Sequence, residues 1–171
     1  MHVDDNSHKT NNMIKISIII PVYNCIQYTR QVVTQIEKYT SNAYELILID
    51  NGSSDETIEL LKSYRNDGNI TVIKNTENMG FAYANNQGIQ RAESEYLCFL
   101  NNDVLLYPDW DVDLLRPFSI YNDIGATGPV TNNCAGVQCE DYSLQNIGKE
   151  SYAVIAQQRS KELANNYREY R

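Results

Sequence analysis

The chain has 171 residues, of which 42% are hydrophobic and 21% charged, so a single compact domain with a sizeable core is expected. Its 14 basic and 22 acidic residues give a formal net charge of −8, which argues against charge-driven binding to nucleic acid or anionic lipid. The longest apolar run, residues 16–22, is far shorter than the roughly 20 residues that span a bilayer. We therefore expect a cytoplasmic protein without an integral membrane segment.

The first part of the chain alternates strand-like and helix-like patterns. Residues 1–13 are polar and without periodicity, so we expect a disordered tail. A short β-branched run that ends in proline predicts a buried strand over Ile14–Pro21. One apolar stripe predicts a helix over Gln27–Tyr39, and a second apolar run predicts a strand over Tyr44–Asp50.

Helix-start signals mark the next two helices. Ser53 and Glu56 have the spacing of a capping box, which predicts a helix that begins there. A third strand is predicted over Asn69–Asn75. After it, Asn78 is the expected cap of a helix that runs to Ala92.

Three further elements complete the alternation. The patterns predict a strand over Glu95–Leu100, a short helix over Pro108–Phe118 and a fifth strand over Ile124–Val130. Repeated strand-then-helix units at this spacing favour parallel strands joined by helical crossovers. The sequence therefore predicts an α/β fold with a doubly wound, mainly parallel sheet.

The last forty residues have a different character. Residues 132–171 begin with a polar, loop-like stretch and continue, from Ser151, as a loosely amphipathic segment that we expect to be a helix. This pattern reaches Arg171 without a helix cap, so we expect the chain to be a fragment of a longer protein.

Polar residues follow three of the predicted strands. Asn24 follows the first strand, residues 50–53 follow the second, and Asn101, Asn102 and Asp103 follow the fourth. Ligands of open α/β sheets bind beyond the carboxyl ends of the strands. We therefore expect these three groups of polar residues to line one crevice.

Four segments, taken together, carry a family resemblance: Ile20–Asn24, Asp50–Asp55, Asn78–Gly88 and Phe99–Asp103, with Pro108–Trp110 behind the last. In order and spacing they resemble the donor-binding half of family-2 glycosyltransferases with the GT-A fold, in particular rhamnosyl- and galactosyltransferase-like members. The resemblance implies a nucleotide-sugar-binding domain over residues 14–131 with a GT-A type of sheet. It also implies that residues 132–171 begin an acceptor-binding part.

The resemblance implies that the first two strand ends hold the nucleoside of a UDP- or dTDP-linked sugar. Pro21, Tyr23 and Asn24 would line the base and ribose. Asn51 would read the pyrimidine edge, since a carboxamide can both accept and donate hydrogen bonds. The full set of implied nucleotide-binding residues is Pro21, Tyr23, Asn24, Asp50, Asn51, Ser53, Gly80, Asn86 (with Asn85 as an alternative) and Asn102.

The same resemblance implies a Mn²⁺ or Mg²⁺ site. Asp103 matches the last carboxylate of the family's D-x-D signature, which holds the metal against the donor diphosphate, whereas Asn101 stands at the first position of that signature. Amide oxygens can coordinate hard cations, but this site carries less negative charge than two carboxylates would. We therefore expect the metal to bind weakly without nucleotide.

The implied reaction moves the sugar to an acceptor hydroxyl with inversion at the anomeric carbon, as in the synthesis of cell-surface glycans. The acceptor would be a glycan or a lipid-linked glycan. Parts of the protein outside this chain could hold the enzyme at the inner face of the membrane. A general base must remove the acceptor proton, and the family places it well downstream, which we expect to be beyond Arg171. Within this chain, Glu140 and Asp141 are the remaining candidates.

Two other functions stay open on the sequence. The chain could be a non-catalytic nucleotide-sugar-binding module of a larger protein, because Asn101 replaces one metal-site carboxylate and no base is evident. A sugar-nucleotide nucleotidyltransferase would use a similar sheet and a metal. That function is disfavoured, because residues 21–25 contain neither the glycine nor the lysine that a triphosphate-binding loop needs.

Overall fold

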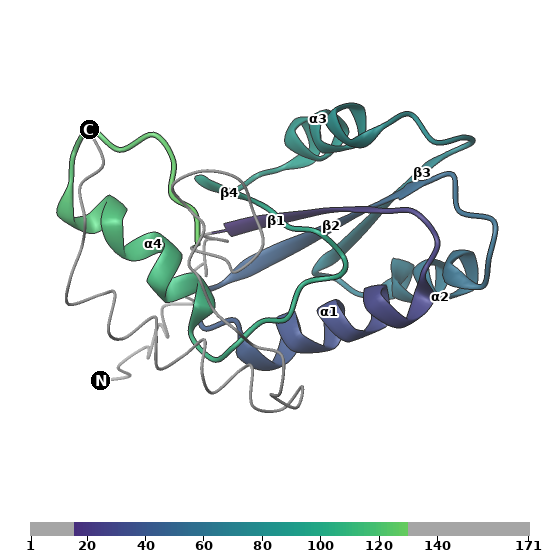
Figure 1. The fold of residues 1–171 in the computed structure, drawn as a ribbon, viewed down its shortest axis with the longest axis horizontal. Coiled ribbons are helices and arrows are strands. Elements are labelled where there is room, and N and C mark those ends of the chain that lie inside the picture. Colours follow the sequence, from purple (N-terminus) through teal and green to yellow (C-terminus); the bar gives the residue numbers. More distant parts are fainter. Residues whose placement is uncertain (1–15, 130–171) are drawn as a thin grey trace, which may run out of the picture.

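The computed structural model describes residues 16–129, which form a four-stranded parallel sheet with helices on both faces (Figure 1). The strands are β1 (Ile16–Val22), β2 (Tyr44–Asn51), β3 (Ile70–Asn75) and β4 (Tyr96–Phe99), in the spatial order β3-β2-β1-β4. The predicted doubly wound α/β fold is confirmed. The expected tail, the helix from Ser151, and the candidates Glu140 and Asp141 lie outside the described residues.

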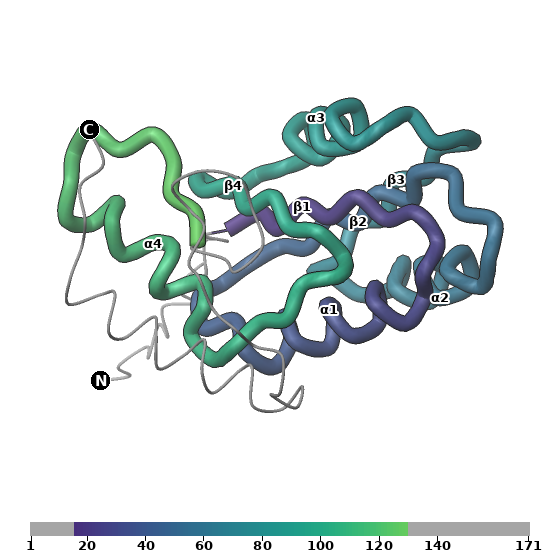
Figure 2. The backbone as a smooth tube through the Cα atoms, in the orientation of Figure 1, coloured from purple at the N-terminus to yellow at the C-terminus, as the bar shows by residue number. Residues whose placement is uncertain are grey.

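Helices cover the two faces of the sheet unequally. The helices are α1 (Ile26–Tyr39), α2 (Thr57–Ser63), α3 (Phe81–Arg91) and α4 (Trp110–Ile120), with a short 3₁₀ turn over Tyr64–Asn66. Figure 2 shows α3 on one side of the strands and α1 and α2 on the other. None of these helices is long and apolar enough to cross a membrane.

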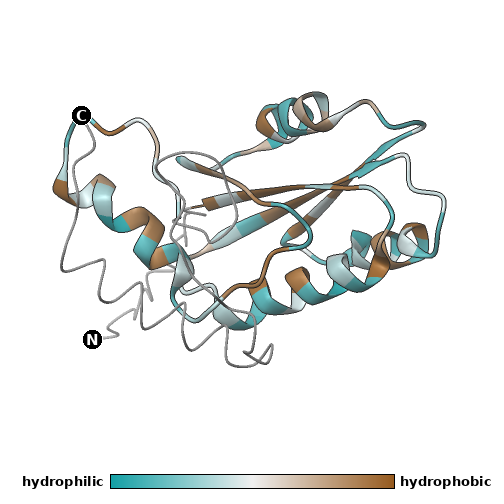
Figure 3. Ribbon diagram, viewed as in Figure 1, coloured by the Kyte–Doolittle hydropathy of each residue, from teal (hydrophilic) through white to brown (hydrophobic). Residues whose placement is uncertain are grey.

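The core is split by the sheet into two clusters because β1 is buried on both faces. Ile18 and Ile20 pack with α1, α2 and α4, whereas Ile19 packs with Ile47 and with Ala84 of α3. Figure 3 shows the hydrophobic colour along most of β1. A continuous apolar strand is what a parallel sheet covered on both faces requires, and each fully buried isoleucine contributes roughly 1.5–3 kcal/mol.

The predicted fifth strand over Ile124–Val130 is wrong where the structure describes it. Residues 124–129 form no ladder with any strand of the described sheet, and they are mostly exposed. The hydroxyl of Thr127 instead donates to the carbonyl of Leu114 in α4. Three of these six residues are glycine or proline (Gly125, Gly128 and Pro129), and such residues favour loops over ladders.

Two predicted helix starts are also wrong. The capping box does not form: α2 begins at Thr57, and the Ser53 hydroxyl accepts a hydrogen bond from the backbone of Asn24 on another strand end. Asn78 does not cap α3, since Gly80 occupies that position with a φ of 85°. The Asn78 side chain accepts instead from the Gly80 N–H, two residues ahead. A contact with a distant strand end thus replaces the expected cap at Ser53, and a turn within residues 78–80 replaces the one at Asn78.

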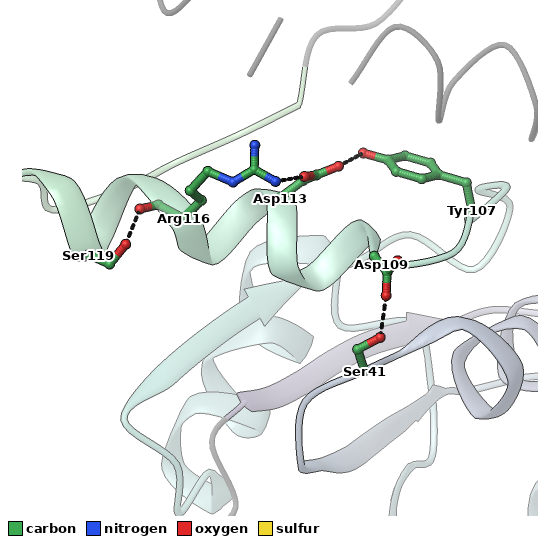
Figure 4. Close-up of polar contacts among 6 residues, drawn as sticks. All are labelled: Ser41, Tyr107, Asp109, Asp113, Arg116 and Ser119. Atoms are coloured by element: carbon green, nitrogen blue, oxygen red, sulfur yellow. Dashed lines mark hydrogen bonds and ion pairs between the residues drawn. The ribbon is translucent and has the colours of Figure 1, made fainter. Parts of the chain in front are cut away.

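The start of α4 is held by polar contacts on either side (Figure 4). Asp109 accepts from the hydroxyl of Ser41, in the loop after α1, with an oxygen–oxygen distance of 2.5 Å. Farther along α4, Asp113 pairs with Arg116 at 2.6 Å and accepts from the Tyr107 hydroxyl at 3.4 Å. The Ser41–Asp109 contact therefore holds the end of the segment between β4 and α4, which carries Asn101–Asp103, against the loop after α1.

Candidate functional site

A pocket of about 290 Å³ opens at the carboxyl ends of the strands. It lies where the strand order reverses: β1 and β2 are neighbours in sequence, whereas β4 joins β1 only after the chain has crossed over by α3. Such a switch point is where open α/β sheets bind ligands. The lining comes from three strand ends and the start of α3: Pro21, Val22, Tyr23, Asn51, Asn78, Phe81, Asn101, Asn102 and Asp103.

Six of the residues predicted for the site line this pocket: Pro21, Tyr23, Asn51, Asn101, Asn102 and Asp103. The structure adds Val22, Asn78 and Phe81, which the sequence reasoning did not assign to ligand binding. Phe81 is 61% exposed although it is aromatic and begins a helix. The signal that could have identified it is an aromatic residue directly after the polar loop at residues 77–80.

The other predicted nucleotide-binding residues do not line the pocket. Asp50 is buried and accepts from the Ser53 N–H at 2.9 Å, so it shapes the turn after β2. The Asn24 side chain accepts from the Ser54 N–H at 2.8 Å, which ties the end of β1 to that turn. Asn86 is exposed on α3 and does not line the pocket.

Tyr23 and Phe81 give the pocket two exposed aromatic rings, with 50% and 61% of their surfaces accessible. Large exposed aromatic side chains in a polar pocket offer flat apolar faces on which a nucleobase or a sugar ring can stack. Asn78, Asn101 and Asn102 add carboxamide groups around those faces. The lining thus suits a ligand that is both planar and polar.

Asn102 is anchored to the core. Its side-chain nitrogen donates to the hydroxyl of Thr29 at 3.1 Å, and Thr29 is fully buried on α1. Nearby, the Leu106 N–H donates to the side chain of Gln35, also on α1. The segment that follows β4 is therefore pinned along α1 at two points, which holds Asn101 and Asp103 at the pocket without burying them.

Among residues 16–129, Asp103 is the one charged residue that lines the pocket. With Asn101 it supplies carboxylate and amide oxygens, the donor types that Mg²⁺ and Mn²⁺ prefer. Within residues 16–129 no group of three or more His, Cys, Asp or Glu side chains could enclose a metal ion. Asp103 and Asn101 therefore fit an open cation site, whose coordination would be completed by oxygens of a bound molecule.

Comparisons with known proteins agree with this fold. The sequence model of the family described as glycosyl transferase family 2 matches residues 17–164. An uncharacterized glycosyltransferase of Rickettsia conorii is 38% identical over 57% of this chain and 16% of its own length. The putative teichuronic acid biosynthesis glycosyltransferase TuaG of Bacillus subtilis is 34% identical over 55% of this chain and 38% of its own length.

Solved structures show the same fold. A crystal structure of S. aureus TarS 1–349 has a TM-score of 0.52 and 25% identity over 62% of this chain and 31% of that chain. The mannosyltransferase PcManGT from Pyrobaculum calidifontis, in complex with GDP-Man and Mn²⁺, has a TM-score of 0.51 and 21% identity over 57% of this chain and 30% of that chain. The chain thus spans well under half the length of these proteins.

Proposed function

The chain belongs to glycosyl transferase family 2, and we propose that its pocket binds a nucleoside diphosphate sugar, UDP- or dTDP-linked, whose sugar is transferred with inversion to a glycan hydroxyl. The observation that carries this proposal is the position of Asp103, at the switch point of the sheet and beside two exposed aromatic rings. We place the nucleoside against Tyr23 and Phe81, and the diphosphate near Asn101 and Asp103.

A divalent cation would offset the electrostatic repulsion between an anionic ligand and the acidic pocket. A diphosphate is an anion, whereas Asp103 is itself acidic and, within the described part of the chain, no Lys or Arg lines the pocket. When bound, Mn²⁺ or Mg²⁺ would stabilise the charge that builds on the departing diphosphate. Asp103 and Asn101 would hold that cation, and Asn102, tied to Thr29, would keep their segment in place.

Catalysis also needs a base on the acceptor side, and we expect it outside residues 16–129. The chain resembles only part of each longer relative, so acceptor transfer by the whole protein is part of this proposal. The name of TuaG supports a glycan of the cell surface as the product.

Thermal unfolding of the 171-residue chain with UDP, dTDP or GDP, each with and without Mn²⁺, tests the donor site. A ligand at a hundred times its Kd stabilises by about 2.7 kcal/mol, which raises the Tm by a few degrees. We expect a shift with UDP or dTDP that requires Mn²⁺ and is lost in Asp103→Asn. Asp123→Asn is the matched control, because Asp123 is exposed and does not line the pocket.

Thermal unfolding tests whether nucleotide binds, and hydrolysis of a nucleotide sugar tests whether the site is also catalytically competent. No shift with any nucleotide would refute the donor site. Slow, Mn²⁺-dependent hydrolysis of a UDP-sugar or dTDP-sugar would show a competent site, whereas binding without hydrolysis would favour a non-catalytic module.

A further inference from the structure

The carboxamide of Asn51 uses all of its hydrogen-bonding capacity inside the protein. Its oxygen accepts from the side-chain nitrogen of Asn75 and from the backbone N–H of Met79, both at 3.1 Å. Its nitrogen donates to the side-chain oxygen of Asn78 at 2.9 Å and to the carbonyl of Gly80 at 3.4 Å. A primary amide offers two acceptor sites and two hydrogens, so none remains for a nucleobase.

The orientation of this amide is dictated by backbone groups. The N–H of Met79 can only donate, which places the oxygen of Asn51 beside it. The carbonyl of Gly80 can only accept, which places the nitrogen on the other side. An aspartate at position 51 has the same shape but no hydrogens in its ionised form. The second carboxylate oxygen of that aspartate would face the oxygens of Asn78 and Gly80, so three acceptors would lie together with no hydrogen between them.

Two more features support this arrangement, one between the loop Glu77–Gly80 and the end of β2 and one behind Asn51. Gly52 has a φ of 83°, and a Cβ built there would lie 2.5 Å from the carbonyl carbon of Glu77. Only glycine allows the two backbones to approach so closely. Behind Asn51, the side chains of Asn75 and Gln87 exchange two hydrogen bonds of 2.8 and 2.9 Å, which extends the amide network into α3.

The geometry points to Asn51 as a positioning residue that holds the loop Glu77–Gly80 at the wall of the pocket, in place of the base-reading role implied by resemblance. Asn78 and Phe81, within and directly after this loop, both line the pocket. Asn51 itself is only 4% exposed. The inference rests on the proposed function in one respect, namely that nucleotide binds in this pocket.

The conservative variant Asn51→Asp separates the two roles. If Asn51 positions the loop, amide exchange of Met79 and Gly80 in the ligand-free 171-residue chain accelerates. The Kd for UDP with Mn²⁺, measured by calorimetry, then rises about tenfold, as for the loss of one or two hydrogen bonds. If Asn51 reads the base, exchange is unchanged and UDP affinity is kept or improved, because a carboxylate accepts from the ring N–H. That result would overturn the inference.

A second variant tests the network without touching the pocket. Gln87 does not line the pocket, and Gln87→Met removes both of its bonds to Asn75. We expect UDP affinity to fall about threefold, and less than additively with Asn51→Asp, because the two residues share one network. The matched control is Gln90→Met, on the exposed side of α3.

Equal UDP affinity and equal exchange in Gln87→Met and Gln90→Met would refute the coupling. If the wild-type chain binds neither UDP nor dTDP, the proposed function fails. In that case the exchange of Met79 and Gly80 in Asn51→Asp still decides whether Asn51 holds the loop.

Discussion

Asp111, in the first turn of α4, binds Asn42 through two hydrogen bonds that join parts of the chain 69 residues apart. The carboxylate accepts from the backbone N–H of Asn42 at 2.8 Å and from its side-chain nitrogen at 2.6 Å. Its second oxygen accepts from the N–H of Ser41 at 3.0 Å, and Asp111 is only 1% exposed. This contact fastens α4 to the loop between α1 and β2.

Asp111→Ala should therefore destabilise the fold. Three donors, from the exposed Ser41 and the half-buried Asn42, lose a charged and buried acceptor. A hydrogen bond to a charged group contributes about 1.5–3 kcal/mol, and partial access of water to these donors reduces the loss. We expect the free energy of unfolding, measured in urea, to fall by about 3 kcal/mol or more. Asp123→Ala, at an exposed acid, should leave it unchanged. A loss below about 1 kcal/mol for Asp111→Ala would contradict this role.

Asn101→Asp should create a tighter metal site. The substitution adds a second carboxylate beside Asp103 at the pocket, and hard cations bind more tightly as carboxylate ligands are added. We expect Mn²⁺ affinity without nucleotide, followed by electron paramagnetic resonance, to be weak in the wild type and to improve roughly tenfold in the variant. Micromolar Mn²⁺ binding by the ligand-free wild type would contradict the prediction.

The Cys98 thiol should make the stability of the fold depend on pH in the alkaline range. Burial, reinforced by the negative charge of Asp111, raises the pKa of the Cys98 thiol from 9.0 to about 12. Between these two values the unfolded chain releases the thiol proton while the folded chain keeps it. The free energy of unfolding therefore falls as pH rises, by at most about 1.4 kcal/mol per pH unit.

Cys98→Ala should make that decline shallower between about pH 9 and 12, and Cys25→Ala, at an exposed cysteine, should not. Burial also raises the pKa of Tyr44 and of Tyr64, so a residual slope is expected in both variants. Identical slopes for the two cysteine variants would show that the Cys98 thiol titrates normally in the folded state.

Asn85→Leu should raise the free energy of unfolding and weaken ligand binding. Asn85 is 93% buried on α3 and its side-chain nitrogen donates to the Phe81 carbonyl, yet its oxygen has no partner among the described residues. A buried acceptor without a partner costs about 1–3 kcal/mol, and asparagine is a poor helix former. We expect Asn85→Leu to raise the free energy of unfolding by about 1 kcal/mol.

We expect the same variant to weaken the stabilisation by UDP and Mn²⁺ if the free oxygen of Asn85 serves a ligand. Asn86→Leu, on the exposed side of the same helix, controls for helix propensity. A higher Tm with undiminished UDP binding in Asn85→Leu would assign this oxygen no role at the pocket.

Strands and helices that bury an apolar face could be predicted closely from the sequence. The ends of β1, β2 and α1 fall within two residues of the predictions wherever the structure describes them. Burial imposes this agreement, since only one periodicity places the isoleucines of residues 16–22 against both clusters. Residues 124–129 show the limit: their composition allows a strand, but a strand needs a ladder partner, and local sequence does not state whether one is within reach.

The sequence by itself determined which strand ends carry polar residues, and hence that Tyr23, Asn51 and Asp103 meet at one edge of the sheet. That much follows from parallel strand direction alone. Only the tertiary structure decided which of their polar atoms are free. The four partners of Asn51 come from β3 and the loop before α3, 24 to 29 residues away. An amide can bind whatever lies beside it, so its role depends on neighbours that the fold supplies.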